Sequence, residues 1–301
     1  MNITRNNETK YLLLVILSIC FLATGGILVK LSNLPPINTG FYRVLFSIPI
    51  LLPFIWKDLL HINKKDFIVM FLAGVFLAGD LSLWNISFNF TSVANANLLA
   101  NFTPFIVIPI SYFIFNEKLT KYFYSGAILT IIGVIILMIG KIEPNINNFF
   151  GDFLALLTSI FYASFLLTVY KLRDRISSAI IMFVSAFGTV FTLFIVLYIT
   201  EGIHIPRTIP DLLPLLGLAL MSQIMGQGLL AYCLGKVNAT LSSLICLTQP
   251  IIASFYAYIL FDEILSFLEI LGMIICIFGV YIAKKLLFRK MILNEYTKTI
   301  L

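Results

Sequence analysis

Ten long apolar runs alternate with short polar joints along the 301-residue chain. A helix that crosses the hydrocarbon core of a bilayer needs about 20 mostly apolar residues. Each run approaches that length, and the joints carry Asn, Pro, Lys, Asp and Glu. The pattern predicts ten membrane-spanning helices, over residues 11–30, 37–56, 67–88, 93–115, 121–140, 150–170, 177–200, 211–234, 239–261 and 266–286.

Composition supports lipid as the solvent for most of this chain. Apolar residues make up 60% of the sequence and charged residues 11%, whereas about a quarter of a soluble domain is charged. So few charges could not cover a water-exposed surface. The short joints leave no room for a soluble domain, so the predicted fold class is an all-α integral membrane protein. In such a protein the net charge of +6 does not indicate nucleic acid.

The placement of Lys and Arg predicts the orientation in the membrane, because cytoplasmic loops carry more positive charge. With the N-terminus inside, 16 of the 20 basic residues face the cytoplasm, three face outward, and Arg43 lies within a span. Both termini are therefore predicted to be cytoplasmic, and residues 287–301 form a cytoplasmic tail. The adjacent basic cluster 284–290 is expected to anchor beside anionic lipid.

The chain contains an internal repeat at an offset of 146 residues. Between 104–134 and 250–280, 11 of 31 positions are identical, including Pro104/Pro250, Glu117/Glu263, Gly126/Gly272 and Gly133/Gly279. Each copy holds five spans. Because five is odd, the second copy enters the membrane in the opposite sense, which predicts two inverted five-helix repeats over 12–140 and 150–286. Such repeats suit a protein that opens to either side of one central site.

The residues of this repeat also carry a family resemblance. The pattern TSVANANLL…P…FNEKLT…G…GV in 91–134 and its echo NATLSSL…QP…FDEILS…G…GV in 238–280 resemble the EamA repeats of the drug/metabolite transporter superfamily. The resemblance implies a bacterial inner-membrane permease, usually an exporter, with a central cavity between its halves. It does not specify the substrate. Family copies often have Gly-Glu where this chain has Asn116-Glu117 and Asp262-Glu263.

Two prolines near the centres of the fourth and ninth spans are predicted hinges. Pro104 and Pro250 each remove a backbone donor and free the carbonyl four residues earlier, on Ala100 and Cys246. In lipid a freed carbonyl needs a partner, so such a break tends to face a cavity or another helix. A simple packing kink is the alternative interpretation.

Two charges lie inside spans at similar depth. Arg43 is on the second helix and Asp80 on the third, and each needs water or a partner in hydrocarbon. One hypothesis is that Asp80 binds a proton or a substrate ammonium while Arg43 binds a carboxylate. The alternative is an ion pair between them, or an Arg43 that reaches the interface, either of which only holds helices together.

Polar and aromatic side chains near the middle of the spans are candidates for contacting a small-molecule substrate. Asn97 and Asn101, four residues apart, share a helix face, as do Gln223 and Gln227. Hydrogen bonding between helices is the alternative role. The predicted substrate-binding set is Asp80, Trp84, Asn97, Asn101, Gln223, Gln227 and Gln249.

Other repeated residues have structural roles in this interpretation. The paired glycines are expected to let the fifth and tenth helices pack closely. Glu117 and Glu263 are expected to stabilise loops and helix ends, and Ser266 with Glu269 forms a predicted capping box.

The sequence thus predicts an alternating-access secondary transporter for a polar organic solute such as an amino acid, with Asp80 as the candidate proton-coupling group. An uncoupled facilitator remains open, and a channel or an intramembrane enzyme are alternatives from other classes. No cofactor motif or metal-ligand spacing is present. The substrate, the direction of transport and the oligomeric state stay open.

Overall fold

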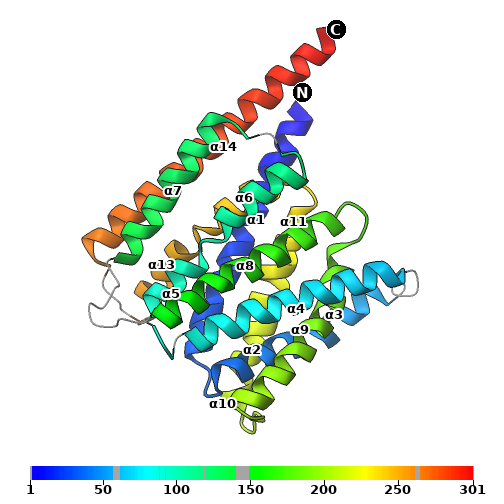
Figure 1. Ribbon diagram of the computed structural model, residues 1–301, viewed down its shortest axis with the longest axis vertical. Helices are drawn as coiled ribbons and strands as arrows, with labels where there is room; N and C mark the ends of the chain where they lie inside the picture. The colour runs from blue at the N-terminus through cyan, green and yellow to red at the C-terminus, as the bar shows by residue number, and fades with distance from the viewer. Residues whose placement is uncertain are drawn as a thin grey trace.

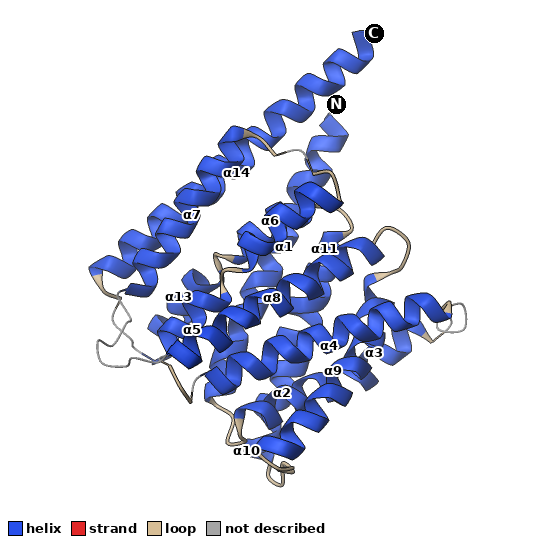
Figure 2. Ribbon diagram, in the orientation of Figure 1, coloured by secondary structure: helices blue, strands red, loops and turns tan. Residues whose placement is uncertain are grey.

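The computed structural model describes residues 2–56, 62–87, 89–91, 93–117, 119–139, 149–261 and 265–300, and the regular elements in these ranges are helices (Figure 2). The first half contains α1 (Asn2–Lys30), α2 (Pro36–Leu45), α3 (Ser47–Ile55), α4 (Lys64–Ser87), α5 (Val93–Ala100), α6 (Thr103–Ile114) and α7 (Lys121–Ile139). The second contains α8 (Phe149–Leu172), α9 (Ser178–Thr200), α10 (Ile209–Gly217), the π-helix η2 (Leu218–Gly228), α11 (Leu229–Leu234), α12 (Ala239–Cys246), α13 (Gln249–Phe261) and α14 (Phe267–Ile300).

The predicted apolar runs coincide with these helices. Eight helical stretches are long and apolar enough to cross a membrane, and two shorter apolar helices, Thr103–Ile114 and Phe267–Ala283, complete a set of ten in the described residues. A multi-pass, all-helical membrane protein is therefore confirmed. The last helix does not stop at the predicted end of its span but continues through the predicted tail to Ile300.

The fourth and ninth spans are interrupted where the two prolines lie. Pro104 occupies the first turn of α6 and Pro250 the first turn of α13, positions where the missing N–H costs no helical hydrogen bond. Each proline thus begins a new helix rather than kinking a continuous one. The Thr103 hydroxyl donates to the freed Ala100 carbonyl at 3.1 Å, which satisfies that oxygen without water.

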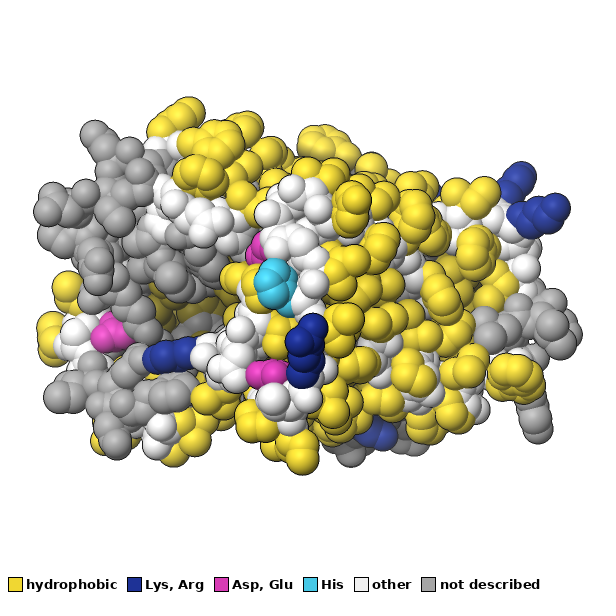
Figure 3. Space-filling model, turned by 90° about the horizontal axis from the view of Figure 1, so that it is seen from below, with side chains coloured by type: hydrophobic (Ala, Val, Ile, Leu, Met, Phe, Trp, Pro, Cys, Tyr) yellow, Lys and Arg dark blue, Asp and Glu magenta, His cyan; other side chains and the backbone are white. Residues whose placement is uncertain are grey.

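The outer surface is predominantly apolar. Figure 3 shows hydrophobic side chains over much of the described part of the face in view, with charged side chains in a few places. Large residues on the long helices are widely exposed, for example Phe113 on α6, Ile128 on α7 and Phe191 on α9. Such an exposed apolar belt is unfavourable in water and is expected of a surface that faces lipid.

Helices of the two halves pack against one another reciprocally. The first helix of the chain, α1, packs on η2 and α13, and the corresponding helix of the second half, α8, packs on α4, α5 and α6. Two further contacts join corresponding helices directly, namely α2 with α9 and α7 with α14, and α6 packs on α12, the counterpart of α5. The pair α7 and α14 lies side by side along one edge (Figure 1).

The α7–α14 contact uses the repeated glycines as predicted. A Cβ added to Gly133 would lie 2.3 Å from the backbone nitrogen of Cys276, and one added to Gly126 would lie 2.7 Å from the carbonyl oxygen of Gly279. The two backbones therefore touch, which only glycine allows. Because Gly126 meets Gly279 and Gly133 meets Gly272, the helices run antiparallel.

The predicted capping box at the start of α14 is also confirmed. The Ser266 backbone N–H donates to the Glu269 carboxylate at 2.8 Å, and the Glu269 N–H donates to the Ser266 hydroxyl at 3.3 Å. Glu263, the repeat partner of Glu117, lies outside the described residues.

Candidate functional site

Arg43 and Asp80 enclose a polar region inside the helix bundle. Arg43 is in the last turn of α2, and Asp80 lies on α4. Their charges interact through space, while the direct hydrogen bond of the guanidinium goes from Arg43 Nε to Gln223 Oε1 on η2, at 3.0 Å. The predicted site residues Arg43, Asp80 and Gln223 therefore come together from three helices and both halves of the chain.

Tyr162 on α8 connects Gln227 to the same region. Its hydroxyl donates to Gln227 Oε1 at 3.3 Å, and the same phenolic group interacts electrostatically with both Asp80 and Arg43. Cys246, at the end of α12, is a further neighbour of the phenol. Aromatic residues inside helices usually serve packing, so the sequence offered little to distinguish Tyr162 from other tyrosines. Its role depends on a contact across 65 residues of chain.

The two glutamines extend from a π-helical segment. The segment η2 spans Leu218–Gly228 within the longer helical stretch Ile209–Leu234. Short π-helical insertions often occur at functional sites. Gln223 and Gln227 are both buried, and both direct their side-chain oxygens to polar partners, Arg43 and Tyr162. Their predicted shared face is thus turned toward the polar region.

A glycine precedes the central polar residue in each half. Gly79 comes before Asp80, and a Cβ there would lie 2.5 Å from the Phe161 ring. Gly226 comes before Gln227, and a Cβ there would lie 2.9 Å from Leu22. Close helix contacts, α4 with α8 and η2 with α1, therefore hold both polar residues at comparable places in the two halves.

The Trp84 and Asn97 side chains form a second polar group on α4 and α5. The Trp84 indole N–H donates to Asn97 Oδ1 at 3.1 Å, and the Asn101 amide donates to the Asn97 carbonyl at 2.6 Å. Trp84 lies one helical turn after Asp80 on α4, which places this group next to the charged one. Gln249 is half-buried at the start of α13, and no described contact joins it to either group.

Several of these side chains keep some accessible surface despite their depth. Arg43, Asp80, Trp84, Asn97 and Tyr162 are half-buried rather than fully buried. The space beside them therefore admits at least water, which a charged pair inside hydrocarbon requires.

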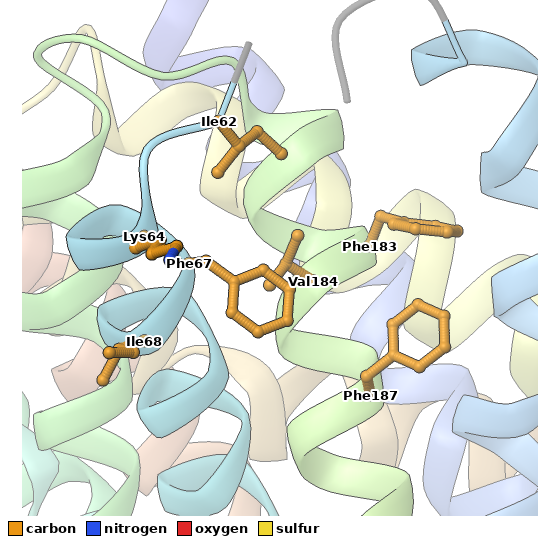
Figure 4. A pocket seen from close by; sticks show the side chains of 7 residues that line it. All are labelled: Ile62, Lys64, Phe67, Ile68, Phe183, Val184 and Phe187. Carbon is orange, nitrogen blue, oxygen red and sulfur yellow. The ribbon is translucent and has the colours of Figure 1, made fainter. Parts of the chain in front are cut away.

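Two cavities in the described part of the bundle differ in how close they lie to this polar region. The larger, about 370 Å³, lies between the start of α4 and α9 and is lined mainly by apolar side chains including Phe67, Phe183 and Phe187 (Figure 4). Its exposed, apolar lining suits lipid rather than a polar solute. A smaller cavity of about 160 Å³ lies between α3, α9 and η2, with Gln223 on its wall. Among the described residues, no group of His, Cys, Asp and Glu is arranged to hold a metal ion.

Comparison with known proteins assigns this architecture. The sequence model of the EamA-like transporter family matches residues 9–139 and again residues 149–284. The chain belongs to the EamA-like transporter family. It is a multi-pass membrane protein and a transporter.

Individual relatives agree with the family. The chain is 26% identical over 231 residues to an uncharacterized transporter, YetK, of Bacillus subtilis, covering 73% of this chain and 69% of that one. It is 24% identical over 292 residues to an uncharacterized transporter of Archaeoglobus fulgidus, covering 91% and 97%. A solved structure titled "Crystal structure of protein" superposes with a TM-score of 0.77 at 13% identity, covering 93% of this chain and 98% of that chain, and shows the same fold.

Proposed function

We propose that this EamA-family transporter exports a small zwitterionic organic solute, such as an amino acid or a related metabolite, by alternating access. The observation that carries the proposal is the arrangement of Arg43 and Asp80. Two opposite charges lie near each other within the bundle, and the hydrogen bond of Arg43 goes to a neutral amide rather than to the acid. A solute with one carboxylate and one ammonium group would satisfy both.

The surroundings of Arg43 fit a carboxylate. In the part of the chain that the structure describes, one of the five guanidinium donors is used, by Gln223. The nearby Ser222 hydroxyl is buried and has no hydrogen-bond partner. A Cβ on Gly25 would lie 2.9 Å from Ser222 Oγ and 4.0 Å from Arg43 Nη1, so Gly25 keeps this place free. A buried unpaired donor is unfavourable, and a carboxylate oxygen would be its acceptor.

Asp80 supports exchange of the solute for a proton. One carboxylate can hold a proton or an ammonium group, but not both at full strength. A proton that reaches Asp80 from outside would displace the ammonium group, and a new solute molecule from inside would displace the proton. This competition couples the two fluxes without a second ion site, and it favours export when the proton gradient points inward.

The reciprocal packing supports two inverted repeats, over 12–140 and 150–286. Exchanging each helix for its counterpart in the other half turns the contacts of α1 with η2, α12 and α13 into those of α8 with α4, α5 and α6. A two-fold relation of this kind gives two opposite openings of one central site, as in other transporters with inverted repeats. The polar region contains residues from both halves.

The predicted orientation completes the proposal. With both termini and the tail 287–301 in the cytoplasm of a bacterial cell, Glu117 faces inward and Glu263 outward. Single cysteines at the exposed positions Lys121 and Phe267, each four residues after one of these glutamates, should react with an impermeant maleimide from opposite sides of the inner membrane. Reaction from the same side would contradict the inverted repeat and the carrier mechanism with it.

Transport by purified protein in proteoliposomes tests the site. Uphill export of radiolabelled zwitterionic amino acids in exchange for protons should require an inward proton gradient. Collapsing that gradient should abolish the uphill transport. Arg43→Gln should weaken solute binding at least about tenfold, since a charge-assisted contact is lost. Asp80→Asn should remove the pH dependence as well.

Asp152→Asn is the matched control. Asp152 lies in the first turn of α8 and accepts a hydrogen bond from Thr91, away from the polar region. It should leave binding and pH dependence unchanged. If Asp80→Asn transports at the normal rate and pH profile, the coupling role is wrong; if uphill transport never depends on the gradient, the protein is an uncoupled facilitator.

A further inference from the structure

Glu117 joins the two halves of the chain at one end of the bundle. It follows α6 in the first half, and its side chain is 8% exposed. The carboxylate accepts a hydrogen bond from the backbone N–H of Ala239 at 3.2 Å and a short one from the Thr240 hydroxyl. Both donors belong to the first turn of α12, in the second half. The carboxylate thus caps a helix N-terminus, where the helix dipole favours negative charge.

The turn before Glu117 is built to direct it there. Asn116 has φ of 54°, in the left-handed region that glycine and asparagine tolerate best. The Glu117 N–H donates back to the Ser111 carbonyl at 3.2 Å, which closes the end of α6. The asparagine found in place of the family's usual glycine therefore preserves the turn. Tyr170 on α8 provides a further hydrogen-bonding neighbour for the carboxylate.

The corresponding helices at the other end of the bundle pack differently in the part of the chain that the structure describes. The internal repeat relates α6 to α13 and α5 to α12, so the counterpart of the α6–α12 contact would join α13 to α5. Among the described residues α6 packs on α12, whereas no comparable packing joins α13 to α5. The position equivalent to Thr240 is Ala94, which has no hydroxyl. In the described residues α6 and α12 are therefore more closely packed than their repeat counterparts, α13 and α5.

We propose that Glu117, Ala239 and Thr240 form a latch that closes the central site on the Glu117 side and must open in each transport cycle. This inference rests on the proposed alternating access. In the state seen here the latch is closed, so in this proposal the central site around Arg43 and Asp80 is reached from the opposite end. With the predicted orientation, the closed side is the cytoplasmic one and the protein rests facing outward.

Hydrogen exchange measured on the full-length protein in lipid nanodiscs, without substrate, tests the latch. Thr240→Val removes the hydroxyl at nearly constant size, and Glu117→Gln removes the charge. Each should raise exchange of the backbone amides of 239–246 by about tenfold, the factor expected for loss of a charge-assisted hydrogen bond. At the same time, the amides of α5 and α13 should become more protected, because opening one end closes the other.

The expected increase in protection of α5 and α13 distinguishes a latch from a simple helix cap. If exchange rises only at 239–246 while α5 and α13 are unchanged, Glu117 merely caps α12 and the proposal fails; it also fails if neither region changes. Thr240→Ser, which keeps the hydroxyl, should show the same hydrogen exchange as the unaltered protein in both regions. Thr189→Val, at a buried hydroxyl between α4 and α9, should change neither region.

The outcome is independent of the transport assay. If hydrogen exchange rises at 239–246 and falls in α5 and α13, but the protein transports no zwitterion, the latch is supported and the proposed substrate is wrong. Proton-coupled transport with only a local change in exchange would keep the proposed function and reject the latch.

Discussion

Two carboxylates cap helices of the opposite half of the chain, but in different settings. Glu201, after α9, accepts hydrogen bonds from the backbone N–H groups of Ile37 and Asn38 and from the Asn38 amide, at 3.0–3.1 Å. It thereby caps α2 much as Glu117 caps α12. Asn38 is fully buried and also bonds the Gly202 carbonyl and the His204 N–H.

The two caps differ in how far the packing between the two halves extends beyond the capped turn. The helix α9 packs on α2 and also on α3, so this contact continues across the bundle. Among the described residues, the close packing between the fourth and ninth spans joins α6 to α12, on one side of the breaks before Pro104 and Pro250. The same chemistry therefore stabilises a permanent contact at Glu201 and, in our proposal, selects one conformation at Glu117.

The largest effect is expected where two backbones touch. Gly133→Ala places a methyl group 2.3 Å from the Cys276 backbone nitrogen, and neither backbone can yield without separating α7 from α14. We expect a loss of about 3 kcal/mol in the free energy of unfolding, as for severe overpacking. Thermal unfolding in detergent measures it.

Gly26→Ala is the control, because a Cβ at Gly26 meets nothing within 4 Å. Alanine there should be neutral or slightly stabilising. Equal melting temperatures for the two variants would show that the α7–α14 contact is not rigid.

Glu201→Ala should cost about 2 kcal/mol of unfolding free energy, because it leaves the N-terminus of α2 and the Asn38 side chain without their acceptor. The loss should appear as a lower melting temperature. Backbone hydrogen exchange should not rise in α12 while it falls in α5 and α13. Such a redistribution would make Glu201 a second latch and remove the contrast with Glu117.

Thr189→Val sharpens the comparison at a smaller scale. The Thr189 hydroxyl donates to the Gly74 carbonyl at 2.9 Å, between α4 and α9. Its loss should cost about 1 kcal/mol of stability, seen in unfolding, without shifting the inward–outward equilibrium. If it shifted that equilibrium as Thr240→Val does, the effect would belong to buried hydroxyls in general.

The smallest effect concerns the turn that directs Glu117. Asn116→Ala should cost about 1 kcal/mol because alanine tolerates the left-handed region less well, while Asn116→Gly should be nearly neutral. Hydrogen exchange at Ala239 should rise only in the alanine variant. The reverse order would show that the asparagine side chain, not its backbone conformation, maintains the latch.

The sequence predicted the local features of the fold well. Apolar length located the helices, the prolines located the breaks in the fourth and ninth spans, and repeated Gly126, Gly133, Gly272 and Gly279 located a close helix contact. Each of these follows from properties of one segment or of a repeated segment. The charge pair and the glutamines were also recognisable as costly polar groups in lipid.

Partners across the bundle could not be predicted in the same way. Helices α2 and η2 are separated by some 180 residues at the Arg43–Gln223 contact, and nothing in either segment specifies the other. The same holds for Tyr162 with Gln227 and for Glu117 with Thr240. The sequence by itself determined that the chain crosses the membrane as a series of helices and where those helices are polar. Only the tertiary structure decided which polar groups meet, because helix packing, rather than any local preference, brings those side chains within hydrogen-bonding distance.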